Sequence, residues 1–260
     1  MTTRAGTAGS PAVVAEQPVP GEVPRYEIPG WRERLGLVAG VTARGSEPGR
    51  GFDLGLWTEA PVGEVMTRWR ALRRMEPGFR GTVLGHQVHG ARVVWHQKGE
   101  GWLQLEGVDG HATAAPGLLL TVTVADCIPV YLADPVRRII ALLHSGWRGT
   151  AAGILAAGIQ RMVGAGSVVG DVVMHCGVGI CGECYEVGHE VMDGCGLSAS
   201  GAGPWHADLR AVLARQAGDL GIGATSTSHW CSMHDYPTFF SHRASGGRDG
   251  RMVAFLGILP

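Results

Sequence analysis

Apolar residues recur along this chain with two different periods, which predict helices in some segments and strands in others. Helical spacing predicts helices over residues 62–75, 150–163, 185–192 and 208–220. Thr150 is the expected N-cap of the helix that it begins. Alternating or continuous apolar runs predict strands over residues 35–42, 82–95, 118–131, 139–144, 168–174 and 252–259, of which 82–95 is a strand or a hairpin. This mixture predicts an α+β or α/β fold.

The same pattern indicates one domain preceded by a tail. Residues 1–24 lack a periodic apolar pattern, so we expect a disordered tail there and a single domain over residues 25–260. The tail has no basic segment followed by an apolar run, as a secretory leader would. The longest apolar stretch is interrupted by Asp126 and Pro129 and is too polar to span a bilayer. We therefore expect a cytoplasmic protein without a membrane partner, either a monomer or a small homo-oligomer.

Charge and composition narrow the possible partners. The chain has 22 basic and 23 acidic residues and a formal net charge of −1, which argues against a nucleic-acid partner. Six cysteines in 260 residues do not resemble a secreted disulfide framework. Lys98 is the one lysine, so the fixed positive charge of a site comes almost entirely from arginine. Glycine, with 42 residues, is about twice as frequent as usual, and much of it stands beside the candidate residues described next.

Residue types that bind metals gather in the middle third of the chain. His86, His89, Cys127 and His144 each stand at a strand end or a bend. The gaps between them are too long for a zinc finger, but they suit a catalytic zinc site assembled from separate strands, with three protein ligands and one open position. The alternative is that the histidines are buried core residues and the cysteine an inert core thiol.

Arginines form a second set of candidates. Arg148 follows Trp147 in a strand-to-helix turn with glycine on both sides, where free N–H groups and a guanidinium suit a phosphate or carboxylate. Alternatively, Trp147 packs in the core and Arg148 caps a neighbouring carbonyl. Arg243 and Arg251 flank a glycine-rich loop, and they either border an anionic substrate or are solvated loop residues.

A second group of thiols admits another reading. Cys176, Cys181 and Cys184 have the spacing of the first three ligands in plant-type iron–sulfur ferredoxins, and Cys195 or Cys231 would supply the fourth. The alternative is ordinary core thiols, because the segment runs directly into the predicted helix at residues 185–192.

Taken together, five motifs are similar to those of a known family. They are Gln87-Val88-His89-Gly90, Ala125-Asp126-Cys127-Ile128-Pro129-Val130, His144-Ser145-Gly146-Trp147-Arg148-Gly149-Thr150, Cys184-Tyr185-Glu186-Val187-Gly188, and Phe240-Ser241-His242-Arg243 with Gly250-Arg251. In this order they closely resemble the laccase-domain, or YfiH-type, family over residues 35–259. The resemblance implies a single three-layer α/β/α-type domain around mixed β-structure, similar to the YfiH-like cysteine hydrolase fold.

The resemblance also implies an activity. Members of the family are zinc-dependent purine nucleoside phosphorylases that use phosphate and act on adenosine, inosine, guanosine and methylthioadenosine, and they also deaminate adenosine. The family's metal ligands match His89, Cys127 and His144, which leaves His86 to line the pocket.

Further roles follow from the same motifs. We expect Cys127, Asp126 and Arg148 to be catalytic, and His86, Gln87, Arg148 and Arg243 to contact the substrate. Asp126 would orient a ligand or shuttle a proton, or it only bends the strand.

Two other functions remain as alternatives. A copper-dependent polyphenol oxidase would need paired imidazoles, typically His-x-His, and none of the eleven histidines stands two residues from another. Copper is therefore the alternative to zinc and not the first choice. A non-catalytic metal-binding protein is the third possibility.

Overall fold

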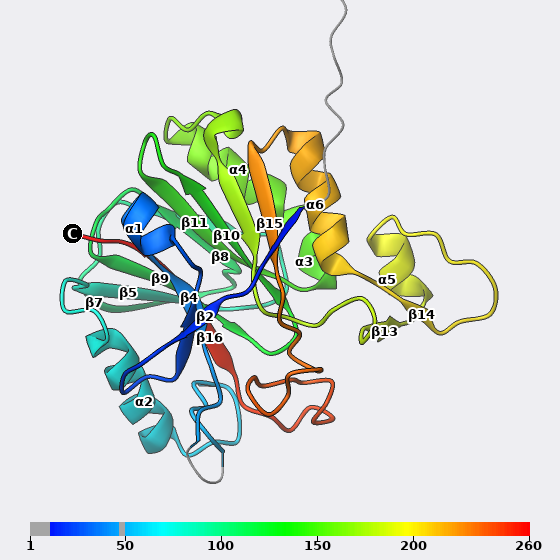
Figure 1. Cartoon of the computed structure of the whole chain (residues 1–260), viewed down its shortest axis with the longest axis horizontal. Coiled ribbons are helices and arrows are strands. Elements are labelled where there is room, and N and C mark those ends of the chain that lie inside the picture. Colours follow the sequence, from blue (N-terminus) through cyan, green and yellow to red (C-terminus); the bar gives the residue numbers. More distant parts are fainter. Residues whose placement is uncertain (1–10, 47–49) are drawn as a thin grey trace, which may run out of the picture.

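A computed structural model describes residues 11–46 and 50–260, and all but two of the strands in this part of the chain form two seven-stranded mixed sheets (Figure 1). The first sheet has the order β1 (Ala12–Val14), β15 (Ala224–Ser228), β12 (Val173–Cys176), β10 (Ile128–Asp134), β11 (Ile139–Ser145), β8 (Gly110–Thr113) and β6 (Val93–His96). The second has the order β2 (Gln17–Val19), β3 (Arg25–Glu27), β4 (Leu37–Thr42), β16 (Met252–Ile258), β9 (Leu118–Val124), β5 (Gly81–His86) and β7 (Gly101–Glu106). The helices are α1 (Trp31–Leu35), α2 (Val62–Arg74), α3 (Trp147–Ala151), α4 (Ile154–Gly164), α5 (His189–Gly194) and α6 (Leu209–Leu220), with a 3-10 turn at Val169–Asp171.

The two sheets pack face to face and carry helices on their outer faces. Tyr131 and Leu142 of the first sheet meet Leu120 and Leu256 of the second in the core between them. Helices α4 and α6 cover the outer face of the first sheet, and α2 covers the outer face of the second, on the other side of the molecule in Figure 1. The mixed α/β single domain predicted from the sequence is confirmed. Its central β-structure is two layers thick, so there are four layers instead of the expected three.

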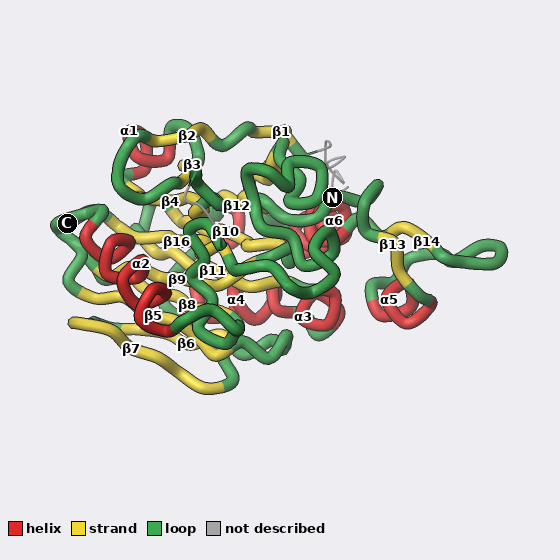
Figure 2. The backbone as a smooth tube through the Cα atoms, turned by 90° about the horizontal axis from the view of Figure 1, so that it is seen from below, coloured by secondary structure: helices red, strands yellow, loops and turns green. Residues whose placement is uncertain are grey.

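A small ribbon projects from this body. It consists of β13 (Glu186–Val187) and β14 (Trp205–His206), and it stands with α5 at the edge of the molecule in Figures 1 and 2. The predicted helix over 185–192 is therefore a short strand followed by α5.

Two predicted strands are each divided between the sheets. The segment 82–95 is neither one strand nor a hairpin, because β5 belongs to the second sheet and β6 to the first. The segment 118–131 likewise becomes β9 in the second sheet and β10 in the first. In both connections a residue other than glycine has a positive φ, 59° at His89 and 88° at Asp126, a left-handed conformation that interrupts the extended backbone.

The helix predicted over residues 150–163 is two helices. Helix α3 begins at Trp147, and Gly153, with a φ of 79°, separates it from α4. The prediction that Thr150 is an N-cap is wrong, because Thr150 lies inside α3. Its hydroxyl instead donates to the carbonyl oxygen of Gly146 at 2.9 Å.

Other predicted elements agree with the structure. Helices occur over most of 62–75 and 208–220, the second capped by the Asp208 side chain, and strands occur in 35–42, 139–144 and 252–259. The strand expected over 168–174 begins as the 3-10 turn and continues as β12. Among the helices of the described residues, none combines the length and apolar character that a bilayer span requires.

Part of the predicted tail is ordered. From residue 11 onward the chain forms β1, which pairs with β15, and β2, which pairs with β3. Buried Glu16 explains why this segment is held: its carboxylate contacts Nε2 of His175 at 2.9 Å and accepts from the Ser228 hydroxyl at 2.7 Å. The prediction of disorder is wrong for this part of residues 1–24, and residues 1–10 lie outside the described residues.

Tyr131 makes a polar contact between the sheets that can be tested by mutation. Its hydroxyl donates to the carbonyl oxygen of Gly40 at 2.7 Å from a buried position. We expect Tyr131→Phe to lower the free energy of unfolding by about 1–2 kcal/mol, because the carbonyl loses a donor in a place that water does not reach. Urea denaturation measures the change. Tyr236→Phe, on a half-buried ring, is the matched control with an expected effect within about 0.5 kcal/mol; equal losses in both variants would contradict the assignment.

Candidate active site

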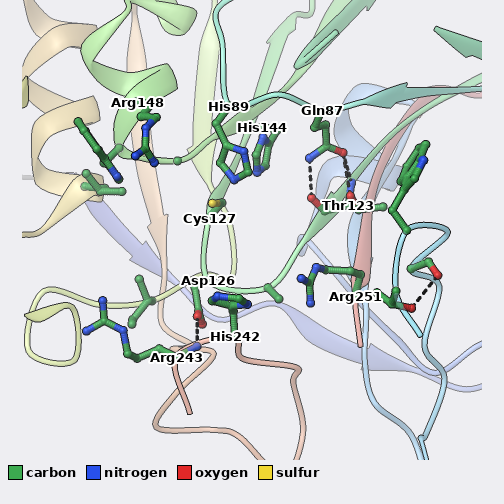
Figure 3. A pocket seen from close by; sticks show the side chains of 18 of the residues that line it. Gln87, His89, Thr123, Asp126, Cys127, His144, Arg148, His242, Arg243 and Arg251 are labelled. Carbon is green, nitrogen blue, oxygen red and sulfur yellow. Dashed lines mark hydrogen bonds between the residues drawn. The ribbon is translucent and has the colours of Figure 1, made fainter. Parts of the chain in front are cut away.

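A cavity of about 540 Å³ opens where strand ends from both sheets converge. The carboxyl ends of β5, β9 and β11 border it, together with the connections that follow β5 and β9, the start of α3, and the loops that carry residues 55–58, 180–185 and 242–251. Its lining side chains, many of them drawn in Figure 3, include Trp57, His86, Gln87, His89, Thr123, Asp126, Cys127, His144, Trp147, Arg148, Tyr185, His242, Arg243 and Arg251. The volume lies in the range of small-molecule sites, about 300–1,000 Å³.

Three potential metal ligands lie together in this cavity. A ring nitrogen of His89, the Sγ of Cys127 and a ring nitrogen of His144 lie within 4.8 Å of one another. Figure 3 shows the two rings side by side above the sulfur. His144 is buried, Cys127 half-buried and His89 exposed, so the group is open to the cavity on one side. The structure thus brings together the three residues that the resemblance implied and leaves His86 outside the group.

Backbone geometry explains how three segments approach so closely. The backbone of His89 has a left-handed conformation, with a φ of 59°, and this conformation sets the direction of its side chain. A Cβ at Gly146 would lie 2.9 Å from the Cys127 sulfur and 3.1 Å from Cδ2 of His89, so a larger residue would displace one of them. A Cβ at Gly149 would lie 2.9 Å from the carbonyl oxygen of Gly90. These two glycines are required by close approach, as the composition suggested.

Asp109 orients the histidine side of the group. Its buried carboxylate contacts Nδ1 of His144 at 3.0 Å and accepts backbone N–H bonds from Val88, His89 and Gly90 at 2.9 to 3.2 Å. Burial alone would raise the pKa of Asp109, but the bonds from His144 and from the Gly90 and Val88 backbone lower it. When a carboxylate bonds to Nδ1 of a histidine, the ring presents Nε2 to a metal. Carboxylates commonly hold metal-binding histidines in this way.

The pKa values of the group favour a thiolate. Burial would raise the pKa of Cys127, but the charge and hydrogen bond of His144, together with His89, lower it to about 6. Burial would lower the pKa of His144, but the Cys127 thiolate and the bond to Asp109 raise it to about 9. Without a metal the pair is therefore a thiolate and an imidazolium at neutral pH. Two imidazoles and a thiolate, open on one side, can hold a transition-metal ion with a free position for water or substrate.

Asp126 holds loops together beside this group. Its carboxylate accepts from the Ser232 hydroxyl at 2.6 Å and from the Arg243 backbone at 2.7 Å, and its carbonyl oxygen accepts from the Ile180 backbone at 2.9 Å. Both carboxylate oxygens are thus occupied by protein donors. This arrangement favours positioning over proton transfer among the roles expected for Asp126.

The arginines expected at the site line the cavity in different ways. Arg148 is exposed, and its guanidinium lies 4.4 Å from the centroid of the Trp147 ring. Arg148 is the second residue of the five-residue helix α3, so it lies in the first turn after the strand-to-helix turn, and the anion site expected there stays a prediction. Arg243 donates to the carbonyl oxygen of Glu186 at 2.7 Å, and Arg251 donates to the carbonyl oxygen of Asp249 at 2.8 Å.

His86 and Gln87 stand on the other wall. His86 contacts Glu106 through Nδ1 at 2.7 Å and stacks on Trp57, with ring centroids 4.4 Å apart. Gln87 uses its amide to connect β5 with β9: Nε2 donates to the carbonyl oxygen of Thr123 at 2.8 Å, and Oε1 accepts from the Thr123 backbone at 2.7 Å. Gln87 therefore shapes the wall, and its expected contact with substrate stays a prediction.

Several residues of the site were not found from the sequence. Asp109 stands between Val108 and Gly110 without a motif, and Trp57 lies in a loop with no apolar period. Tyr185 and His242 stand in the family motifs, which give neither of them a role of its own. A buried carboxylate with four hydrogen-bonding neighbours has no local signature, because its partners come from other segments.

The second group of thiols differs from the expected one. Cys181 and Cys184 lie together with Cys231 and His234, and their ligand atoms are within 4.8 Å of one another. Cys176 is buried in β12 outside this group, so the proposed iron–sulfur set of Cys176, Cys181 and Cys184 is not formed.

A two-histidine, one-cysteine group open to a cavity with three arginines is the arrangement typical of metal-dependent enzymes that act on small polar ligands. The chain belongs to the family described as multi-copper polyphenol oxidoreductase laccase, whose model matches residues 39–259.

Individual relatives agree with this assignment. A purine nucleoside phosphorylase of Deinococcus radiodurans is 37% identical over 181 residues, covering 66% of this chain and 68% of that protein. Adenosine deaminase RL5, from an unknown prokaryotic organism, is 31% identical over 247 residues, covering 86% of this chain and 94% of that protein. The crystal structure of YlmD from Geobacillus stearothermophilus matches with a TM-score of 0.83 at 27% identity, covering 94% of this chain and 100% of that one.

Cys127 is expected to be the most reactive cysteine of the metal-free protein. A pKa of about 6 makes it a thiolate at neutral pH, whereas burial raises the pKa of Cys176 to about 12. Because the pKa is lowered, the rate of alkylation by iodoacetamide should rise with pH through about 6 and then level off, and added zinc should protect. Mass mapping of each cysteine measures this. Alkylation of Cys195 at the same rate as Cys127 would refute the assignment.

Asp109→Asn is expected to weaken metal binding. We predict a loss of about 10–100-fold in affinity, because the amide no longer offers a charged acceptor to His144. Competition with a chromophoric chelator measures the affinity. Asp134→Asn is the matched control, since Asp134 is also buried and accepts backbone N–H bonds, from Val136 and Arg137, at the far end of β10. Unchanged affinity in Asp109→Asn would show that this carboxylate does not support the ligands.

Proposed function

We propose that this chain is a zinc-dependent purine nucleoside phosphorylase that also deaminates adenosine. The observation that carries the proposal is the group of His89, Cys127 and His144 in a cavity lined by arginines. Relatives with matching sequence over most of their length bear the names purine nucleoside phosphorylase and adenosine deaminase. Its substrates are phosphate and purine nucleosides such as adenosine, inosine, guanosine and methylthioadenosine.

Zinc is the metal that best suits the donor set. Three ligands of the His2Cys type with one open side are a catalytic zinc arrangement. A multi-copper centre needs several imidazoles around several ions, and the other ligand group among the described residues has three thiols and one imidazole. Copper and polyphenol oxidation therefore come second. When bound, zinc supplies Lewis-acid activation of water or of a polar substrate atom.

Arginines are suited to hold the phosphate. In phosphorolysis a phosphate oxygen forms a bond to C1′ of the ribose while the glycosidic C–N bond breaks, and its electron pair leaves with the purine. Arg148 lies above Cys127 and Arg243 below it in Figure 3. Guanidinium groups on both sides of the ligand group attract the phosphate and position it for attack, because they pair with its oxygens at fixed angles.

The opposite end of the cavity offers aromatic surface for the base. Trp57 is 46% exposed and stacks on His86, which leaves one indole face available to a planar purine. On the arginine side of the cavity, Tyr185 lies under the Arg243 guanidinium, 5.3 Å from its ring centroid, and burial together with the Cys127 charge raises its pKa to about 12. Its hydroxyl therefore stays protonated at neutral pH and donates a hydrogen bond to the substrate.

Chromatography of products with and without phosphate tests the function. The protein should convert adenosine and phosphate to adenine and ribose 1-phosphate, and it should release some inosine without phosphate. Cys127→Ala should reduce both activities by about 10³-fold, because the ligand group is lost. Arg148→Ala should lower kcat/KM for phosphate by about 10²-fold and reduce phosphorolysis more than deamination.

Controls separate the alternatives. Arg70→Ala, which changes an exposed arginine of α2 outside the cavity, should leave both activities unchanged. Inosine as the only product would identify a hydrolytic deaminase. Oxygen uptake with phenols would identify the oxidase, and a bound metal without turnover of any nucleoside would identify a non-catalytic metal-binding protein.

A further inference from the structure

A second cluster of metal-binding side chains lies on two loops next to the cavity. Cys181 and Cys184 belong to the loop that follows β12, and Cys231 and His234 belong to the loop that follows β15. Their three sulfurs and one ring nitrogen lie within 4.8 Å of one another. The cluster uses none of the ligands of the first site.

The distances suit a small tetrahedral ion. Zinc bonds of about 2.3 Å to sulfur and about 2.0–2.1 Å to nitrogen place neighbouring sulfur and nitrogen ligands about 3.5 Å apart. The Sγ of Cys181 lies 3.7 Å from Nδ1 of His234. The spacing within each pair, Cys-x2-Cys and Cys-x2-His, is the short spacing that structural zinc sites use.

The backbone around Cys231 is arranged for a thiolate. The N–H groups of Cys181 and His234 point at the Cys231 sulfur at 3.3 and 3.5 Å. Such donors stabilise negative charge on sulfur, as is common around metal-bound thiolates. The first of them comes from a chain segment 50 residues away, so the two loops are already docked on each other around the sulfur.

We propose that Cys181, Cys184, Cys231 and His234 bind a structural zinc ion, separate from the ion in the cavity. All four positions of a tetrahedral ion are filled by protein, which leaves no place for substrate and distinguishes this site from an open catalytic one. Three thiolates and one imidazole form one of the ligand sets of structural zinc sites, Cys3His.

The position of this ion indicates that it stabilises one wall of the cavity. Cys184 directly precedes Tyr185, and Ser232, next to Cys231, donates to the carboxylate of Asp126. The backbone of Ser232 also donates to the carbonyl oxygen of Gly179 at 3.0 Å. An ion that joins the two loops therefore fixes the wall that presents Tyr185 to the cavity and supports the bend beside Cys127.

Metal content of purified wild-type and variant chains tests the proposal without any assay of turnover. Wild-type protein, purified with a thiol reductant and zinc, should contain about two zinc equivalents per chain. Cys127→Ser should keep about one, and so should Cys184→Ser, because each loses a different site. His234→Ala, at an exposed position compatible with folding, should bind its second zinc at least about 10-fold more weakly.

Cobalt provides a spectroscopic identification of the ligands. Cobalt added to metal-free Cys127→Ser should give the intense sulfur-to-metal charge-transfer absorption of a three-thiolate site. Cys195→Ala removes a buried thiol outside both groups and is the matched control, with an expected content equal to wild type. The proposal fails if Cys127→Ser binds no zinc, if Cys184→Ser retains the wild-type content, or if the protein forms a Cys181–Cys184 disulfide on exposure to air in the presence of excess zinc.

Discussion

The hydrogen bonds of one buried carboxylate, that of Asp109, hold the ligand-bearing parts of the site in register. Asp109 contacts the ring of His144 and three successive backbone N–H groups of residues 88–90, so one charge aligns a ligand side chain and the turn that carries another. The His144 backbone in turn donates to the carbonyl oxygen of Asp109 at 2.7 Å. A buried carboxylate with this many hydrogen-bond donors is stable as an anion. The loss of any donor destabilises the folded protein, because the cost of removing the charge from water is then no longer offset. The geometry around Cys127 depends on this arrangement.

Much of the secondary structure could be predicted from periodicity, because it depends on local pattern. Helix α6 has both an apolar face and an Asp208 cap, and both signals lie in adjacent residues. The passages between sheets could not be predicted in the same way. A strand buried on both faces, such as β10, reads as a continuous apolar run, and nothing in the run from 118 to 131 indicates that the two halves pair with different partners. Order in residues 11–24 depends on Glu16 meeting His175 and Ser228, which are distant in sequence.

The residues of the candidate site also divide into those that the sequence could predict and those that it could not. His89, Cys127 and His144 were recognisable because metal ligands are restricted to few residue types and stood at strand ends. Asp109 and Trp57 were not, since a carboxylate or an indole acquires its role only from the segments that fold against it. The cysteine spacing that suggested an iron–sulfur set also misled for this reason. Cys176 points into the core from β12, and the loop that follows β15 supplies Cys231 and His234 instead.

The passage of the chain between the two sheets at Asp126 has a thermodynamic consequence. The candidate ligands come from the end of β11 in one sheet, the connection that follows β5 in the other, and the bend that joins β9 to β10. An ion that binds them binds only the state in which both sheets are folded and packed together. Free metal therefore acts as a stabilising ligand of the whole domain, worth about 2.7 kcal/mol at a concentration one hundred times its dissociation constant. The supply of metal around the protein thus shifts the folding equilibrium of the whole domain as well as the fraction of it that is loaded.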